Sequence, residues 1–292
     1  MSFFKGRTFL LTGVVLFLCL LLIWPQRAIS GATEGLVLWY RSVLPAQLPF
    51  VIAVRLLLAL NIQGGVFLSI LVGMIAGYPM GALTADYLCS TGAVARERAT
   101  PLAALTNLPG PSFVISTVGV TLLGSTTLGY LLLLICWLSS ALLLFLFYIL
   151  SSEQEKNQIV QQSIKSCQYI KEKKPFGRLL SDAVSEGAEL MIRIGGFIVL
   201  FSVILQFISS PFGVLLEITG GLKWITQHVS SMPWKLMLCS FLLGFSGVCV
   251  IAQSLAVTDS QKIQSGRFVL YKLLQGITGA TLMGVICQFL TC

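Results

Sequence analysis

The chain alternates between long apolar runs and short polar connectors, a pattern typical of a protein that crosses a membrane several times. The first apolar run, residues 9–23, follows Lys5 and Arg7 and precedes Trp24-Pro25-Gln26-Arg27. That tetrapeptide is a poor signal-peptide cleavage site, because cleavage requires small residues. Residues 1–29 are therefore predicted to hold an uncleaved N-terminal transmembrane helix.

Three later runs are interrupted by glycine, proline and small polar residues. The interruptions lie at residues 77–82, 106–112 and 244–253. Proline removes a backbone donor and glycine tolerates bends, so a membrane helix opens at such a point. Backbone N–H and C=O groups left unpaired at membrane depth must form hydrogen bonds with other parts of the protein or face a polar cavity. Each interruption therefore indicates either a packing kink or part of a binding site, and the first and third are expected to form re-entrant hairpins.

The remaining segments predict a scaffold helix, a loop and two interfacial segments. Residues 128–150 form an uninterrupted apolar run, typical of a lipid-facing helix. Residues 151–180 are polar with an excess of lysine, which predicts a cytoplasmic loop. Residues 30–41 and 181–193 mix charged and apolar positions, which predicts interfacial segments that each lead into a crossing.

The two halves of the chain share this order of elements. Residues 30–150, including the scaffold helix, and residues 181–292 each hold an interfacial segment, a crossing and an interrupted run. Tracing the chain through the membrane gives the two halves opposite orientations. We predict an all-α polytopic membrane protein, an inverted repeat of helix, re-entrant hairpin and broken helix with about six crossings plus two hairpins. Such repeats are typical of secondary transporters, whose site lies between the broken segments.

The interruptions supply most of the candidate substrate-binding residues, because unwound backbone and helix N-termini offer free N–H donors to an anion. The alternatives are a tight crossing of small residues at the first interruption and a proline-kinked structural helix at the second. The predicted residues are Gly77, Tyr78, Pro79, Gly81, Thr106, Asn107, Gly110, Ser112, Glu217, Thr219, Ser246, Gly247 and Gln253.

Glu217 is included because a carboxylate in an apolar stretch is costly unless it is paired or functional. Three roles are open for it: holding a proton or cation, pairing with Arg55 or Arg193, or reaching water at the interface. Lys223 follows closely and makes the interfacial role as reasonable as the others.

Composition narrows the range of functions. Hydrophobic residues make up 56% and charged residues 10% of the 292, which excludes a soluble domain. The net charge of +8 suits topology control or an anionic substrate better than nucleic acid. The eight cysteines include no C-x-x-C pair, and the one histidine, His228, lies in a polar connector. No metal site or disulfide framework is predicted.

The same residues argue against an enzyme, because no nucleophile and base occur together in the spans. No cofactor is expected apart from a coupling cation or proton. The expected partners are the lipid bilayer and a small anionic substrate, with no nucleic acid, and a homo-oligomer is left open.

The motifs at the interruptions, taken in order, resemble the YlbJ family of sporulation integral membrane proteins, also called SpoVV. The resemblance begins near Gly35 and extends to the C-terminus. It places the chain in the nucleoside-recognition or Gate group, which is distantly similar to concentrative nucleoside transporters. The motifs are Gly77-Tyr78-Pro79-Met80-Gly81-Ala82, Thr106-Asn107 with Gly110-Pro111, Gly195-Gly196-Phe197, Leu216-Glu217-Ile218-Thr219-Gly220-Gly221, and Gly244-Phe245-Ser246-Gly247 with Gln253.

This resemblance implies passage of dipicolinic acid from the mother cell across the outer forespore membrane during sporulation. The first interruption and Asn107 would then meet the dianion, and Tyr78 or Phe113 would stack on its ring. Two alternatives stay open: a nucleoside or nucleobase transporter, and a non-transporting scaffold of a sporulation complex.

Overall fold

Helices are the only regular secondary structure in the part of the chain that the structure describes. The computed structural model describes residues 2–60, 65–150, 175–208, 212–259 and 261–290. Five stretches within these ranges are long and apolar enough to cross a membrane, namely Pro25–Ala59, Thr126–Leu150, Phe176–Leu205, Met232–Ala256 and Ser265–Phe289. The predicted all-α polytopic class is confirmed. Residues 151–174 of the predicted cytoplasmic loop lie outside the described residues.

Helix α1 (Ser2–Ile23) is followed almost at once by a second, longer helix. Pro25 occupies the first turn of α2 (Pro25–Leu38), where its missing N–H is tolerated. α2 continues through the π-helical turn η1 (Trp39–Val43) into α3 (Leu44–Ala59) without a break. The predicted boundary at residue 29 therefore falls inside α2, and residues 30–41 belong to the same continuous helix as the segment that follows them. Residues 181–193 likewise belong to one helix, α9 (Phe176–Leu205).

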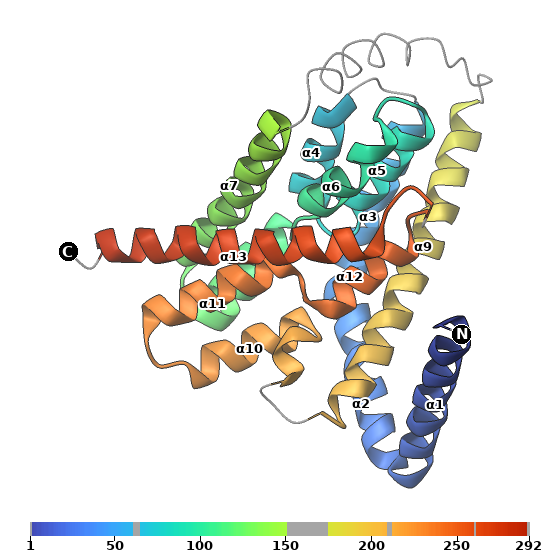
Figure 1. Ribbon diagram of the computed structural model, residues 1–292, viewed down its shortest axis with the longest axis vertical. Coiled ribbons are helices and arrows are strands. Elements are labelled where there is room, and N and C mark those ends of the chain that lie inside the picture. Colours follow the sequence, from blue (N-terminus) through green and yellow to red (C-terminus); the bar gives the residue numbers. More distant parts are fainter. Residues whose placement is uncertain (1, 61–64, 151–174, 209–211, 260, 291–292) are drawn as a thin grey trace.

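These two long helices, α2–α3 and α9, run antiparallel along each other (Figure 1). Gly31 and Gly35 of α2 lie against the last turns of α9, and a Cβ on Gly35 would lie only 2.8 Å from the Cα of Val199. At the other end, Arg55 Nη1 lies 3.0 Å from Glu186 Oε2. Small residues thus let the two helices approach closely, as is common in membranes. The opposite directions of the two helices are those that an inverted repeat requires.

The first interrupted run folds into the predicted hairpin. α4 (Gly65–Ala76) and α5 (Met80–Ser90) pack against each other, and Ser69 Oγ donates to the carbonyl of Gly81 over 3.2 Å. α6 (Arg96–Thr106) then ends at Asn107, and the chain continues into η2 (Phe113–Leu122) and α7 (Thr126–Leu150). Residues 107–110 therefore separate two short helices, within the second interruption predicted at residues 106–112.

The second half differs from the expectation at residues 244–253. After η4 (Phe212–Leu215), it is α10 (Ile218–His228) and α11 (Met232–Phe245) that pack against each other. α11 and α12 (Gly247–Ala256) are joined through Ser246, whose φ of 79° is left-handed, and they make no comparable contact. The expected hairpin within residues 244–253 is thus a break between consecutive helices. Its physical cause is that α12 packs against α9 and α5 instead of folding back on α11.

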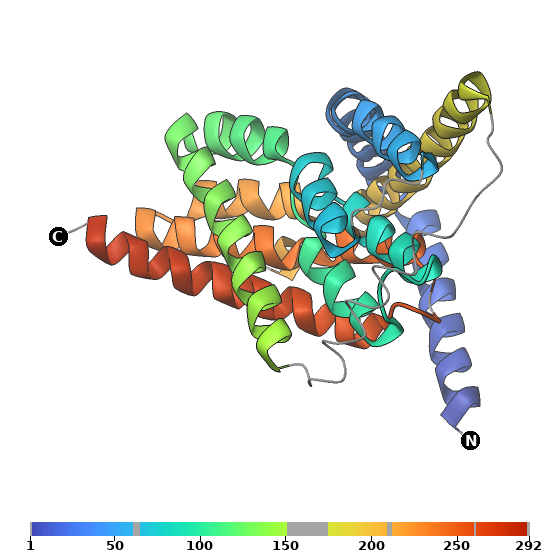
Figure 2. The ribbon, with the colours of Figure 1, turned by 90° about the horizontal axis from the view of Figure 1, so that it is seen from above.

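The last helix, α13 (Ser265–Leu290), ties the two halves together. It packs along α11 and crosses α6 and α7, as Figures 1 and 2 show. Two buried apolar clusters each contain residues from both halves, Val51 with Ile194 in one and Tyr78 with Leu243 in the other. The halves therefore share their cores and form a single folded unit.

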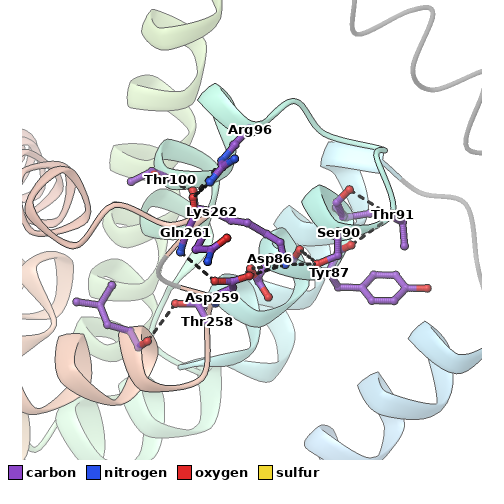
Figure 3. Close-up of polar contacts among 12 residues, drawn as sticks. Asp86, Tyr87, Ser90, Thr91, Arg96, Thr100, Thr258, Asp259, Gln261 and Lys262 are labelled. Atoms are coloured by element: carbon purple, nitrogen blue, oxygen red, sulfur yellow. Dashed lines mark hydrogen bonds and ion pairs between the residues drawn. The ribbon is translucent and has the colours of Figure 1, made fainter.

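A polar cluster joins α5 and the first residue of α6 to the connection after α12 (Figure 3). Lys262 Nζ lies 3.0 Å from Asp259 Oδ2 and 4.0 Å from Asp86 Oδ1. The guanidinium of Arg96 donates through Nε to the carbonyl of Gln261 over 3.0 Å. Charged side chains of α5 and α6 in the first half thus contact the connection after α12 in the second half.

Candidate functional site

A cavity of about 350 Å³ lies where the interrupted helices of the two halves meet. Its walls come from the long helix α2–α3, the first hairpin, η2, α9 and the segments that begin α10 and α12. The lining residues are Leu38, Ser42, Val43, Ala46, Gln47, Phe50, Ile75, Ala76, Tyr78, Gly110, Pro111, Ser112, Phe113, Ser116, Thr117, Ile194, Ile198, Glu217, Ile218, Thr219, Cys249, Val250 and Gln253. Both halves contribute, as expected for a site between inverted repeats.

The predicted site residues divide into two groups by position. Those that line the cavity are Tyr78, Gly110, Ser112, Glu217, Thr219 and Gln253. Those that lie behind its wall are Gly77, Pro79, Gly81, Thr106, Asn107, Ser246 and Gly247. The second group shapes the backbone that carries the first.

Close backbone contact explains the glycines behind the wall. Gly77 has a left-handed φ of 78°, and a Cβ there would lie 2.7 Å from the amide nitrogen of Gly110. Gly81 approaches the carbonyl of Thr106 so closely that a Cβ would lie 2.1 Å from that oxygen. In the second half, the amide of Cys249 donates to the carbonyl of Leu216 over 2.8 Å. The first half therefore packs one interruption directly against another, and the second half packs its interruption against the residues that precede α10.

Tyr78 connects the first interruption to the second half. Its ring lines the cavity, and its hydroxyl donates to the carbonyl of Leu243 over 2.6 Å. Leu243 lies in the last turn of α11, whose final carbonyls have no partner within their own helix. The phenol therefore satisfies a buried acceptor that the break at Ser246 leaves open.

Glu217 is 7% exposed and caps the N-terminus of α10. One carboxylate oxygen accepts from the amide of Thr219 over 3.0 Å, and the other accepts from the amide of Gly220 over 2.6 Å. The predicted pairing with Arg55 or Arg193 is wrong, since these arginines contact Glu186 and Glu189 of α9 instead. The two hydrogen bonds of this helix cap hold the carboxylate of Glu217 at the cavity wall.

The cavity has a polar but largely uncharged lining. Its described walls hold one carboxylate, Glu217, and no lysine, arginine or histidine. Hydroxyl groups come from Ser42, Ser112, Ser116, Thr117 and Thr219, and aromatic rings from Phe50, Tyr78 and Phe113. Gln47 adds a side-chain oxygen that is buried and has no hydrogen-bond partner. Such a lining suits a small, partly aromatic ligand with a few polar groups.

A second polar group lies behind the cavity, at the end of α6. Asn107 Nδ2 donates to Ser254 Oγ over 2.8 Å, which links the second interruption to α12. The carbonyl of Asn107 accepts from Lys272 Nζ over 2.8 Å, and that ammonium also donates to Gln275 Oε1 over 2.6 Å. Lys272 lies 5.7 Å from the centre of the Tyr78 ring. Tyr78 therefore contacts both this buried polar group and the cavity.

Sequence reasoning missed Lys272, Gln275 and Gln47. Lys272 carried a usable signal, because a lysine within an apolar span is rare and commonly functional. Gln47 lies between Pro45 and Pro49, in a stretch that the sequence predicts to cross the membrane with its first turns bent or opened by the two prolines. Nothing in the sequence marked which face of that helix meets the cavity.

This fold defines an all-α polytopic membrane protein, with a cavity between interrupted helices of two halves. The chain is 30% identical to the sporulation integral membrane protein YlbJ of Bacillus subtilis strain 168, over 96% of this chain and 83% of that protein. The chain therefore belongs to the YlbJ family of sporulation integral membrane proteins. No family model and no solved structure matches the chain.

Proposed function

We propose that the protein is a secondary transporter that moves a small organic anion, dipicolinic acid, across the outer forespore membrane during sporulation. The observation that carries this proposal is the position of the cavity. It lies where the interrupted helices of both halves meet, the arrangement that transporters use to expose one site to either side in turn. Its volume of about 350 Å³ lies within the range of small-molecule sites.

The chemistry of the lining fits a compact aromatic diacid in part. Phe50, Tyr78 and Phe113 offer ring faces, and the hydroxyls of Ser112 and Thr219 offer donors to carboxylate oxygens. Glu217 opposes such a ligand, because two like charges in a poorly solvated site repel each other. Transport of an anion through this cavity therefore requires that Glu217 lose its charge.

A proton is the simplest means of removing that charge. Each oxygen of Glu217 accepts one backbone N–H group and keeps one free lone pair, which is enough for a proton but not for a metal cation that needs several oxygen ligands. A proton needs no further ligands. We therefore assign Glu217 the role of proton carrier, taking up one proton with each anion. Tyr78 and Cys249 are the other titratable groups in the lining.

Uptake of radiolabelled dipicolinate into proteoliposomes of the full chain tests this function. Wild-type protein should accumulate the label, and an inward proton gradient should increase the initial rate several-fold. Glu217→Gln should retain uptake but lose the response to the gradient. Thr12→Val in α1, away from the cavity, should behave as wild type. Wild-type vesicles that take up no dipicolinate above empty vesicles would refute the proposed substrate.

Apart from Glu217, the lining is uncharged, which favours a second candidate, a nucleoside or nucleobase. Gln47 and Gln253 present amides to the cavity, and amides pair well with the edges of a base. Competition distinguishes the two candidates: excess uridine should leave dipicolinate uptake unchanged if the anion is the substrate. If reconstituted vesicles carry neither compound while substitutions at the interruptions alter recruitment of sporulation proteins, the chain acts as a scaffold instead.

A further inference from the structure

Lys272 is a fully buried ammonium group in the middle of α13. In the part of the chain that the structure describes, no carboxylate lies within ion-pair distance of its Nζ. Removing an ammonium group from water costs several kcal/mol unless other groups replace the lost hydration. Its two hydrogen bonds, to the carbonyl of Asn107 and to Gln275 Oε1, supply that replacement together with the ring face of Tyr78.

One of the two acceptors of Lys272, the carbonyl of Asn107, lies at the C-terminal end of α6, and the other, Gln275 Oε1, lies one turn further along α13. The last carbonyls of a helix have no partner within it, and they carry the negative end of the helix dipole. Gln275 Nε2 donates to the carbonyl of Leu105 over 3.3 Å, and Ser140 Oγ donates to the same oxygen over 2.6 Å. Asn107 Oδ1 is also buried there and has no hydrogen-bond partner. The end of α6 is thus a cluster of buried oxygen atoms, one of which, the carbonyl of Asn107, accepts from Lys272.

Such a cluster is the kind of site at which broken membrane helices bind a coupling cation, because unwound carbonyls and helix C-termini coordinate Na⁺. We infer that Lys272 in its protonated form is a resident cation that fills this site in place of a carried ion, so that the protein works without Na⁺. This inference rests on the proposed transport function, because only a transporter would otherwise carry the ion that Lys272 replaces.

Tyr78 extends the effect of this charge to the cavity. Its ring lies between Lys272 and the cavity lining, 5.7 Å from Nζ, and no closer cation lines the cavity walls that the structure describes. In a poorly solvated interior a positive charge acts over a longer distance than in water. Lys272 is therefore a positioning residue: it holds the end of α6 and gives an otherwise acidic cavity a positive neighbour.

Thermal unfolding of the purified full chain in detergent tests the inference without any substrate. The melting temperature is measured in NaCl, KCl and choline chloride at equal ionic strength. Wild-type protein should melt at the same temperature in all three salts. Lys272→Ala leaves a vacancy among the oxygens, so NaCl or methylammonium chloride should raise its melting temperature over choline by at least about 2 °C. Lys223→Ala, at an exposed lysine of α10, should show no such difference.

Two results would overturn the inference. One is a wild-type protein that NaCl stabilises over choline, because the site would then be open. The other is a folded Lys272→Ala protein that is as indifferent to cations as wild type. If Lys272→Ala does not fold, Lys272→Met, which keeps most of the side-chain volume, takes its place. If neither variant folds, the melting temperatures of the wild-type protein in the three salts decide. Because dipicolinate is absent, failure of the proposed substrate in uptake assays leaves this result standing.

Discussion

The hydroxyl of Tyr78 donates a 2.6 Å hydrogen bond to the carbonyl of Leu243, across 165 positions of the sequence. The donor belongs to the interruption in the first half and the acceptor to the last turn of α11 in the second. Both residues are buried. One bond therefore holds the two interrupted regions together at the wall of the cavity.

Tyr78→Phe should destabilise the protein, because it leaves the buried carbonyl of Leu243 without its donor. An unsatisfied buried acceptor costs about 1–3 kcal/mol. For a chain of this size each kcal/mol lowers the melting temperature by roughly 2–4 °C. Thermal unfolding in detergent measures the loss, and Tyr40→Phe, at a tyrosine with 66% exposure, is the control that should melt as wild type. Equal melting temperatures for both variants would show that the bond contributes nothing.

Gly77→Ala should cost more than Gly92→Ala, although both glycines have a left-handed φ, 78° and 74°. A left-handed φ costs an L-residue about 1–2 kcal/mol. Gly92 pays only that penalty, because nothing lies within 4 Å of a Cβ built on it. At Gly77 the Cβ would also lie 2.7 Å from the amide nitrogen of Gly110.

The comparison of these two alanine variants isolates the contact between the first and second interruptions. Unfolding temperatures and the yield of folded protein in detergent report the difference. If Gly92→Ala destabilises the chain as much as Gly77→Ala, the close approach of residues 77 and 110 is not what the first interruption requires.

The class and much of the first half could be predicted from the sequence. Bilayer thickness sets the length of the apolar runs. A cluster of glycine and proline in such a run leaves backbone groups unpaired, and these groups need hydrogen-bond partners elsewhere in the protein. This reasoning placed the hairpin at Gly77–Gly81 and the break after Thr106 correctly. It also predicted interfacial segments at residues 30–41 and 181–193 that lead into crossings, and each of them is continuous in one helix with the residues that follow it.

The second half shows why a break does not reveal its own geometry. Gly244–Gly247 and Gly77–Gly81 look alike as sequences, yet α4 and α5 fold back on each other while α11 and α12 do not. The difference depends on which distant helix each short helix packs against, and such tertiary contacts cannot be read from the local sequence. The same limit applies to the cavity: Gln47 and Thr117 face it only because of how the long helix and η2 rotate against their neighbours.

Glu217→Ala should destabilise the protein more than Glu217→Gln. Glu217 accepts the amides of Thr219 and Gly220 at the start of α10, and loss of an N-terminal cap costs about 0.5–2 kcal/mol. Glutamine keeps one acceptor oxygen and the side-chain volume, whereas alanine keeps neither. Melting temperatures in detergent should therefore fall in the order wild type, glutamine, alanine. An alanine variant that melts with the glutamine variant would indicate that the cap is not what fixes this carboxyl group.

The last prediction concerns pH and the connection between α12 and α13. The amide of Gln261 donates to Asp259 Oδ1 over 2.9 Å, and this bond, with the nearby Lys262, lowers the pKa of Asp259 below its ordinary 3.8. A lowered folded-state pKa stabilises the fold above the unfolded value, and the stabilisation is lost as the pH falls through the folded-state pKa. Wild type should therefore melt above Asp259→Asn near neutral pH, and the gap should narrow once the pH falls below 3.8. Melting curves of both proteins across this range measure the gap, and a gap that stays constant down to strongly acidic pH would contradict the role of the ionised carboxylate.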